Sequence, residues 1–183
     1  VRIPRLMRDI PSKFIIAGCK DLALRGTIRK RMRQAGIQCR CIRCREYGHR
    51  LRDGWTIGKH WLTRMDYETY GGEEIFLSYE DENETLFGLL RLRMNGKSSP
   101  LKGEGSMRVR ELHVFGSEVP LGERWAQAAQ HRGLGEKLLR EAERIATEEF
   151  HLRKLSILSG IGARDYYRSL GYELEGVYMV KEL

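Results

Sequence analysis

The sequence predicts an α+β domain, in which a mixed and mostly antiparallel sheet is flanked by helices, preceded by a basic, cysteine-containing helical linker. Three observations lead to this prediction. Strand-like alternation recurs from residue 66 onward, a glycine-rich hexapeptide opens an amphipathic helix, and basic residues are concentrated before residue 66. We therefore expect a basic linker over residues 1–65 and a folded domain over residues 66–183.

The composition restricts the class of protein. The chain has 183 residues, of which 41% are hydrophobic, so it can bury a core and disorder is not the default. The sequence contains no apolar run of about 18 residues and no secretory signal, so we expect no membrane partner. It begins at Val1, and charge is already dense over residues 2–9, which indicates a piece of a longer protein.

The first part of the chain predicts a cationic helix. Residues 21–35 place Leu24, Ile28 and Met32 at four-residue spacing, and Gly36 follows as a stop signal. Residues 1–65 contain 17 Lys and Arg against 4 Asp and Glu, a net charge of +13, whereas the remainder contains 16 against 21, a net charge of −5. Such an uneven distribution is typical of a polyanion-binding arm, with a solvated basic surface as the alternative.

Three of the four cysteines fall within six residues, at Cys39, Cys41 and Cys44. Thiolates this close can share one metal ion, and a tetrahedral zinc site needs a fourth ligand. That ligand could be His49, Cys19 or a residue outside this chain. The spacing fits neither a zinc ribbon nor the Cys-x-x-x-Cys-x-x-Cys pattern of a radical iron–sulfur site. The alternative is a set of reduced thiols in a cytosolic protein.

Aromatic residues are interleaved with these cations, at Tyr47, Trp55 and Trp61. Aromatic rings between Lys and Arg can stack on unpaired bases. Burial in a core is nevertheless the more frequent role of such rings, and we favour it for each of them.

From residue 64 onward the pattern predicts a meander of three strands, over residues 65–70, 73–80 and 85–94. Residues 107–115 predict a fourth strand. Simple alternation would put Val109, Glu111, His113 and Phe115 on one of its faces, and the intervening residues on the other.

The chain is organised around the hexapeptide Gln-His-Arg-Gly-Leu-Gly at residues 130–135, which has the form Gln-x-x-Gly-x-Gly. A predicted helix runs from Gly133 to about residue 150. One face of that helix carries the apolar residues Leu134, Leu138, Ala142, Ile145 and Ala146. An uncovered helix start presents free N–H groups and the positive end of the dipole, so it can hold a pyrophosphate. An ordinary helix start with two turn glycines is the alternative.

The remaining elements are a buried strand over residues 154–159, a short helix over residues 162–170 that carries Tyr166 and Tyr167, and a last strand over residues 172–180. The order of strand, phosphate-type loop, helix, strand, short helix and strand resembles the acetyl-CoA-binding core of the GNAT acetyltransferases. The resemblance implies the GNAT acyl-CoA N-acyltransferase fold.

Longer strings resemble one family more specifically, the catalytic subunit of Elongator, which modifies the wobble uridine of tRNA. They occupy residues 8–12, 39–46, 110–116, 119–120, 130–135, 141–146, 159–167, 170–174 and 178–179. Because the cysteine cluster is complete, an archaeal or bacterial member is the better match. Cys19 and the segment at residues 125–129 depart from the family pattern.

This resemblance implies a function for the longer protein. A radical S-adenosylmethionine domain with a [4Fe–4S] cluster, absent from this chain, would join a C-terminal acetyltransferase domain. Acetyl-CoA would supply the two carbons of a 5-carboxymethyl group on the wobble uridine, and tRNA would stimulate acetyl-CoA hydrolysis. The implied partners are tRNA, the radical domain and other Elongator-type subunits, and the implied location is the cytoplasm.

The resemblance also assigns site residues, and the chemistry of each is compatible with its assignment. The implied acetyl-CoA contacts are Glu111, Leu112, His113, Val114, Gln130, Gly133, Leu134, Gly135, Glu136 and Tyr167. Tyr167, helped by Tyr166, is expected to protonate the leaving thiolate, and Glu111 is a candidate base. The alternatives are helix packing for the tyrosines, an ion pair for Glu111 and a structural role for His113.

Two other functions remain open. The first is a lysine N-acetyltransferase acting on a protein, against which the basic arm argues. In addition, the turn at Gly71 and Gly72 leaves no room for the helices that a general acetyltransferase has between its first two strands. The second is an RNA-binding module whose acetyltransferase fold is only a scaffold. Acetyl-CoA binding and the response to tRNA would distinguish the three.

Overall fold

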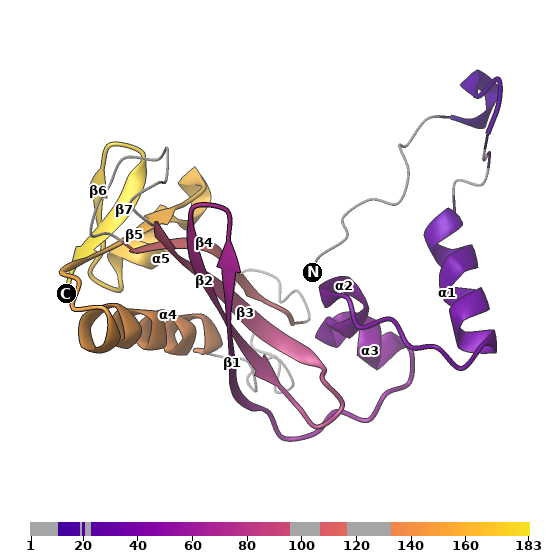
Figure 1. Ribbon diagram of the computed structural model, residues 1–183, viewed down its shortest axis with the longest axis horizontal. Coiled ribbons are helices and arrows are strands. Elements are labelled where there is room, and N and C mark those ends of the chain that lie inside the picture. The colour runs from indigo at the N-terminus through magenta and orange to yellow at the C-terminus, as the bar shows by residue number, and fades with distance from the viewer. Residues whose placement is uncertain (1–10, 19, 21–22, 96–106, 117–132) are drawn as a thin grey trace. The chain divides into compact units, whose positions relative to one another are not determined.

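The computed structural model describes residues 11–18, 20, 23–95, 107–116 and 133–183 (Figure 1). The chain divides into two compact units, Val1–Trp55 and Thr56–Leu183. We call them the N-terminal unit and the sheet unit. Within the described residues, no helix combines the length and the apolar character that crossing a membrane requires.

In the part of the N-terminal unit that the structure describes, the 3₁₀ turn η1 (Ser12–Phe14) is followed by three helices, α1 (Leu24–Gln34), α2 (Ile42–Arg45) and α3 (Tyr47–Arg52). The predicted stop at Gly36 is confirmed. Gly36 adopts a left-handed φ of 68°, and the amide of Ile37 donates to the carbonyl of Met32 at 2.8 Å. This is a Schellman ending, which satisfies the last carbonyls of a helix and favours glycine at the left-handed position.

The apolar core of this unit is small. Helix α1 buries none of its residues, and the buried side chains of α2 and α3 are Ile42, Cys44, Tyr47 and Arg50. Because so little apolar surface is removed from water, burial stabilises this unit weakly. Other contacts must hold it together.

The described residues of the sheet unit form a sheet of seven strands. They are β1 (Trp61–Thr69), β2 (Gly72–Glu80), β3 (Leu86–Asn95), β4 (Met107–Val114), β5 (Lys154–Leu158), β6 (Glu173–Glu175) and β7 (Tyr178–Glu182). Their order is β1-β2-β3-β4-β5-β7-β6, and β4 with β5 is the parallel pair among otherwise antiparallel neighbours. The predicted mixed, mostly antiparallel sheet is therefore confirmed, although β1 begins four residues earlier than the predicted strand.

Helix α4 (Leu134–Arg144) lies along one face of this sheet and continues into the π-helical turn η3 (Ile145–Glu149) (Figure 1). Its predicted apolar face is confirmed, since each of its five residues is at most 1% exposed. Leu138, Ala142, Ile145 and Ala146 belong to one core cluster with residues of the strands, among them Leu77, Leu90 and Leu155. Burying each large side chain contributes roughly 1.5–3 kcal/mol, so the sheet unit has a substantial core.

The predicted alternation along β4 was wrong beyond Val109. Val109 pairs with Leu92, but Glu111 pairs with Arg91, so Arg110 is an extra residue on β4. Such a β-bulge switches the faces of the residues that follow it. Leu112 consequently packs against the buried core, and Val114 approaches α4.

The predicted last strand was also wrong, because residues 172–180 do not form one strand. They contain β6 and the start of β7, which pair as an antiparallel hairpin. Gly176 has a left-handed φ of 62° at the turn, a conformation that glycine adopts without a steric penalty. The short helix α5 (Arg164–Arg168) is preceded by the 3₁₀ turn η4 (Ile161–Ala163), so the predicted helix over residues 162–170 is shorter than expected.

Candidate functional site

The parallel strands β4 and β5 separate part of the way along their length. They pair at three positions, from Met107 with Leu155 to Val109 with Ile157. Beyond that point β4 continues to Val114 while keeping its pairing with β3. The β5-facing edge of residues 110–114 therefore has no strand partner among the described residues, so its backbone groups can accept an extended, amide-rich ligand as an added strand.

Helix α4 begins beside the open edge of β4. Its N-cap, Gly133, has a left-handed φ of 83°, and among the described residues no side-chain hydrogen bond caps the helix. The first intrahelical bond of this segment runs from the amide of Lys137 to the carbonyl of Gly133 at 2.8 Å. The amides of Leu134, Gly135 and Glu136 precede it and lack an acceptor in the helix, which makes this helix start suited to an anion.

Gly135 lies where β4, α4 and α5 meet. A Cβ atom at this position would lie 2.7 Å from the hydroxyl oxygen of Tyr166 and 3.6 Å from Cγ2 of Val114. Such a contact is shorter than van der Waals packing allows, so a larger residue at this position would force the partly exposed Tyr166 side chain to move. The structure thus brings together Val114, Gly135 and Tyr166, three of the residues that the sequence nominated.

The two adjacent tyrosines have different surroundings. Tyr167 is 7% exposed and belongs to the core, where its ring meets that of Tyr172 at 6.1 Å between centroids, whereas Tyr166 is 41% exposed. Burial raises the pKa of both phenols, and for Tyr166 the neighbouring Tyr167 and Glu136 add to the effect. Both hydroxyls are therefore protonated at neutral pH, as a proton donor must be.

Glu111 and His113 lie on the part of β4 that follows the bulge. The Glu111 carboxylate forms an ion pair with Arg91, at 3.2 Å between Oε2 and Nε. No sequence motif marks Arg91, and only the register of β3 against β4 identifies it as the partner. The imidazole of His113 packs against the ring of Phe115, with 4.7 Å between centroids.

The hexapeptide is only partly described. Gln130, His131 and Arg132 lie outside the described residues, as does Cys19. The predicted contact from Gln130 to acetyl-CoA consequently stays a prediction.

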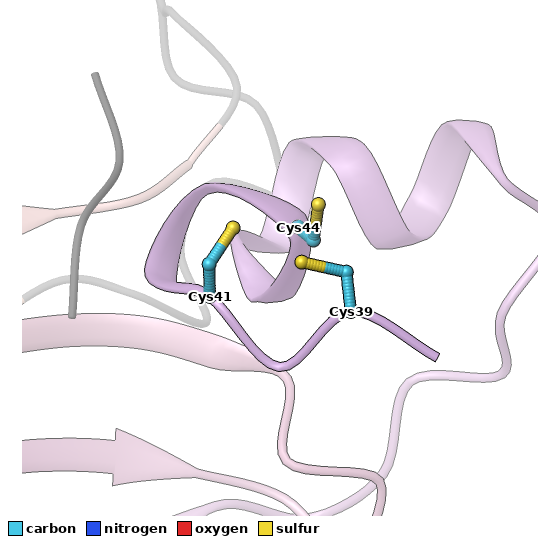
Figure 2. Close-up of side chains that lie close together, drawn as sticks. All are labelled: Cys39, Cys41 and Cys44. Carbon is cyan, nitrogen blue, oxygen red and sulfur yellow. The ribbon is translucent and has the colours of Figure 1, made fainter. Parts of the chain in front are cut away.

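In the N-terminal unit, the three predicted thiols come together. The sulfur atoms of Cys39, Cys41 and Cys44 lie within 4.8 Å of one another, and Figure 2 shows them turned toward a common centre. Tetrahedral zinc thiolate sites hold their sulfurs about 3.8 Å apart, as follows from a Zn–S distance of about 2.3 Å. The chemistry and the spacing of this donor set therefore fit a zinc ion.

The three thiols shift one another's pKa values. Burial and contacts with Cys41 and Cys39 raise the pKa of Cys44 to about 12. Burial also raises the pKa of Cys41, but the backbone amide of Cys44 and the neighbouring sulfurs outweigh it and lower that pKa. A bound cation would remove this conflict, because it stabilises all three thiolates at once.

His49 is not part of the thiol cluster. Its Nε2 atom lies 3.6 Å from the carboxylate of Glu46, and its Nδ1 atom lies 3.0 Å from Arg52. Burial and the nearby Arg52 lower its pKa. Within the described residues, the set of close metal-ligating side chains consists of the three cysteines, so the identity of a fourth ligand stays open.

A family model for the acetyltransferase (GNAT) family matches residues 40–172. This match covers well over half of the chain, and the splayed parallel strands with the uncapped helix start agree with it. The chain belongs to the acetyltransferase (GNAT) family.

More specific relatives match the whole chain. The tRNA uridine(34) acetyltransferase of Dehalococcoides mccartyi is 58% identical over 187 residues, and that of Methanocaldococcus jannaschii is 49% identical over 191 residues. Human Elongator complex protein 3 is 45% identical over 190 residues. The resemblance to the Elongator catalytic subunit is therefore confirmed. The chain spans 40%, 35% and 34%, respectively, of the lengths of these relatives.

A solved structure agrees with the sequence relatives. The archaeal Elp3 of Methanocaldococcus infernus, with an N-terminal deletion, superposes with a TM-score of 0.84 at 46% identity. The match covers 98% of this chain and 43% of that one. The predicted GNAT fold, preceded by a cysteine cluster, is confirmed.

Proposed function

We propose that this chain is the acetyl-CoA-binding part of an enzyme that forms 5-carboxymethyluridine at the wobble position of tRNA. In this proposal, tRNA stimulates hydrolysis of acetyl-CoA. The observation that carries the proposal is the separation of β4 from β5 beside the uncapped start of α4. The names of the relatives supply the tRNA uridine as the acceptor.

Acetyl-CoA fits the opening in two parts. Its pantetheine arm would pair with the open edge of residues 111–114, as an added strand does. Its pyrophosphate would accept from the amides of Leu134, Gly135 and Glu136. Gln130 and Gly133 would lie along the same approach, as the family pattern implies.

The hydrolytic step would proceed by attack of water on the thioester carbonyl carbon. A C–O bond forms, the C–S bond breaks, and the thiolate takes its proton from the phenol of Tyr167 or Tyr166. Glu111 would accept the proton of the attacking water. A phenol kept protonated by burial is suited to the role of acid, which contributes about 10²–10⁴-fold to a rate.

The N-terminal unit would bind the RNA. Residues 11–55 carry 12 Lys and Arg against 3 Asp and Glu, and α1 presents Arg25, Arg29, Lys30, Arg31 and Arg33 without burying an apolar face. Cationic side chains on phosphates supply affinity and register, while base contacts would choose the tRNA. A zinc ion held by the three cysteines would fix the shape of this unit.

The remaining steps belong to the longer protein. The family implies a radical S-adenosylmethionine domain with a [4Fe–4S] cluster, which would attach the two-carbon unit to the uridine. Other Elongator-type subunits are further expected partners, and the cytoplasm is the expected location.

The test compares acceptors. Acetyl-CoA turnover by this chain is measured alone, with tRNA and with a lysine-containing peptide. We expect tRNA to accelerate turnover and the peptide to leave it unchanged. Acetylation of the peptide lysine instead would favour a protein acetyltransferase, and RNA binding without any affinity for acetyl-CoA would favour a non-catalytic scaffold.

A matched pair of variants tests the proton donor. Tyr167→Phe and Tyr166→Phe each remove one hydroxyl and keep the ring. We expect Tyr167→Phe to lower tRNA-stimulated turnover by about 10²-fold or more, with the Kd of acetyl-CoA unchanged. If Tyr167→Phe retained full turnover while Tyr166→Phe lost it, the donor would be Tyr166.

A further inference from the structure

The N-terminal unit contains a cavity of about 430 Å³ between α1, the segment after it and α3. Met32 and Ile37 supply apolar lining, and Trp55 supplies an aromatic ring. Arg29, Arg33 and Arg50 also line it. This volume falls within the range of small-ligand sites and far exceeds that of a water molecule or a bare phosphate.

The cavity carries a net positive charge. Asp53 pairs with both Arg29 and Arg33, the latter at 3.0 Å, and Arg50 adds a further cation. Burial raises the pKa of Asp53, but the two guanidinium groups outweigh it and lower that pKa, so the carboxylate is ionised at neutral pH. The lining thus contains three arginines and one aspartate, together with Cys39 and Cys44 of the thiol cluster. The majority of arginines favours an anionic ligand.

Arg50 is the buried arginine of the lining. This side chain is 2% exposed, and its guanidinium stacks on the ring of Trp55 at 3.8 Å from the centroid. With the amide of Gln38 turned so that its oxygen faces Arg50, that oxygen accepts from both terminal nitrogens, at 2.6 and 2.7 Å. Trp55 and Gln38 are both neutral, and together they hold the guanidinium over the indole ring.

We propose that this cavity binds one unpaired nucleotide of the RNA. Arg29 and Arg33 hold its phosphate, and its base lies against the Arg50–Trp55 stack and the apolar wall. Arginine planes and aromatic rings are the two kinds of side chain on which proteins stack bases. The inference rests on the proposed binding of tRNA and adds a defined subsite to it.

The combination of walls favours a nucleotide over other anions. Inorganic phosphate would use the arginines but leave the apolar and aromatic lining unoccupied. A fatty or purely apolar ligand would gain nothing from the guanidinium groups of Arg29 and Arg33, which share the single carboxylate of Asp53. A nucleotide satisfies both parts, since it joins a charged phosphate to a flat, apolar-faced base.

The direct test titrates the chain with UMP, CMP, AMP and GMP, followed by calorimetry, and separately with labelled tRNA, followed by anisotropy. We expect the mononucleotides to bind and to compete with tRNA. Trp55→Ala should weaken mononucleotide binding about five- to 100-fold. Its control is Trp61→Ala, which removes a half-exposed tryptophan from β1, outside the cavity, and should leave binding unchanged.

A second pair tests the charge. Arg33→Gln removes a cavity cation, whereas Arg31→Gln removes a cation of the same helix that does not line the cavity. We expect Arg33→Gln to weaken mononucleotide binding and Arg31→Gln to leave mononucleotide binding unchanged. Because both side chains belong to the cationic helix α1, each variant should reduce the salt dependence of tRNA binding by about one phosphate contact.

A third pair of variants, both at Ile37, tests whether the nucleotide lies against this exposed residue of the cavity wall. Ile37 is 56% exposed, so substitutions there should leave the fold intact. Ile37→Glu should repel the phosphate and abolish mononucleotide binding. Ile37→Gln, whose side chain has the shape of glutamate but no charge, should retain part of that binding. Metal content and Tm identical to those of the parent chain show that each variant is folded.

The outcomes separate this inference from the proposed function. If tRNA binds and stimulates turnover, but mononucleotides do not bind and all three pairs behave alike, the cavity proposal is wrong while the proposed function stands. The cavity proposal would also be wrong if the bound mononucleotides were displaced by the 3′-phosphoadenosine diphosphate part of coenzyme A and not by tRNA. No tRNA binding by the parent chain would reject both.

Discussion

The two units of this chain are stabilised by different means. In the sheet unit, α4 and the strands bury a continuous set of apolar side chains, of which Leu77, Leu138 and Leu155 are fully inaccessible. In the N-terminal unit, α1 buries no residue, and its Arg29 and Arg33 form ion pairs with Asp53, the residue that follows α3. The same unit also contains the cluster of Cys39, Cys41 and Cys44, which could bind a metal ion.

This difference indicates a division of roles. A unit rich in exposed cations cannot bury much surface, so it needs a metal ion or a polyanion to become rigid. A unit with a large core can leave one strand edge and one helix start unsatisfied for a ligand. Perturbations should therefore act on one unit and spare the other.

Removal of the metal should have the largest effect. In Cys44→Ala, the thiol that lies deepest is lost, so zinc binding and the fold of the N-terminal unit should be lost with it. Binding of structural zinc contributes about 10–16 kcal/mol. Metal analysis and limited proteolysis would show an open N-terminal unit, while acetyl-CoA still binds.

His49→Ala is the companion variant, because His49 is engaged with Glu46 and Arg52. It should keep its zinc. Zinc retained by Cys44→Ala, or lost from His49→Ala, would show that the site is not the one described.

A core substitution should destabilise the sheet unit. Leu138→Ala removes a fully buried side chain of α4. It should lower the unfolding free energy, measured by urea denaturation, by about 2–5 kcal/mol. The matched control is Leu158→Ala at a position that is 62% exposed, which should cost less than about 0.5 kcal/mol. Equal costs for the two variants would contradict the core assignment.

A smaller and more local effect is expected at the start of α4. Gly135→Ala places a methyl group against the Tyr166 hydroxyl and should weaken acetyl-CoA binding about tenfold, equivalent to about 1.4 kcal/mol. Because Tyr166→Phe removes the clashing oxygen, the double variant should recover affinity. Calorimetric titration with acetyl-CoA measures both; a double variant no better than Gly135→Ala would locate the clash elsewhere.

The smallest effect concerns pH. Burial raises the pKa of Glu74, but a hydrogen bond from Tyr67 at 2.8 Å and the ion pair with Arg110 outweigh it and hold the pKa below its ordinary 4.5. A depressed carboxyl pKa adds stability above the unfolded value, and this stability is lost as pH falls through the folded value.

Urea denaturation between about pH 6 and about pH 3 would test this contribution. The stability gap between the parent chain and Glu74→Gln should shrink as pH falls. Glu73→Gln, an exposed residue of the same strand, is the control. A gap that stays constant would mean that Glu74 does not contribute through its charge.

Periodicity predicted most of the fold, because apolar spacing reports directly on burial. The apolar face of α4 and the first three strands were found in this way. The bulge at Arg110 could not be predicted, since it depends on how β3 and β4 align and not on the local sequence. The turn at Gly176 was missed because the residues on both sides of it read equally well as one strand.

The sequence predicted which residues form the candidate site but not how their side chains are arranged. The three cysteines, Gly135 and the tyrosines were identified from motif and resemblance. The different burial of Tyr166 and Tyr167 arises from the packing of α5 beside α4, which adjacent positions in a sequence do not reveal. The pairing of Arg91 with Glu111 likewise depends on a contact between separate strands. The Arg50–Trp55 stack instead forms within the turn that follows α3, where the amide of Trp55 donates to the carbonyl of Arg50 at 3.1 Å.

The most direct test of the account measures tRNA-stimulated acetyl-CoA hydrolysis and the Kd of acetyl-CoA side by side, at about 50 mM and about 200 mM salt. If the N-terminal unit binds RNA through its cations while the sheet unit binds acetyl-CoA through backbone groups, the stimulation should fall steeply with salt while the Kd of acetyl-CoA changes far less. Stimulation that is insensitive to salt, or that falls only in parallel with acetyl-CoA binding, would contradict this division of roles.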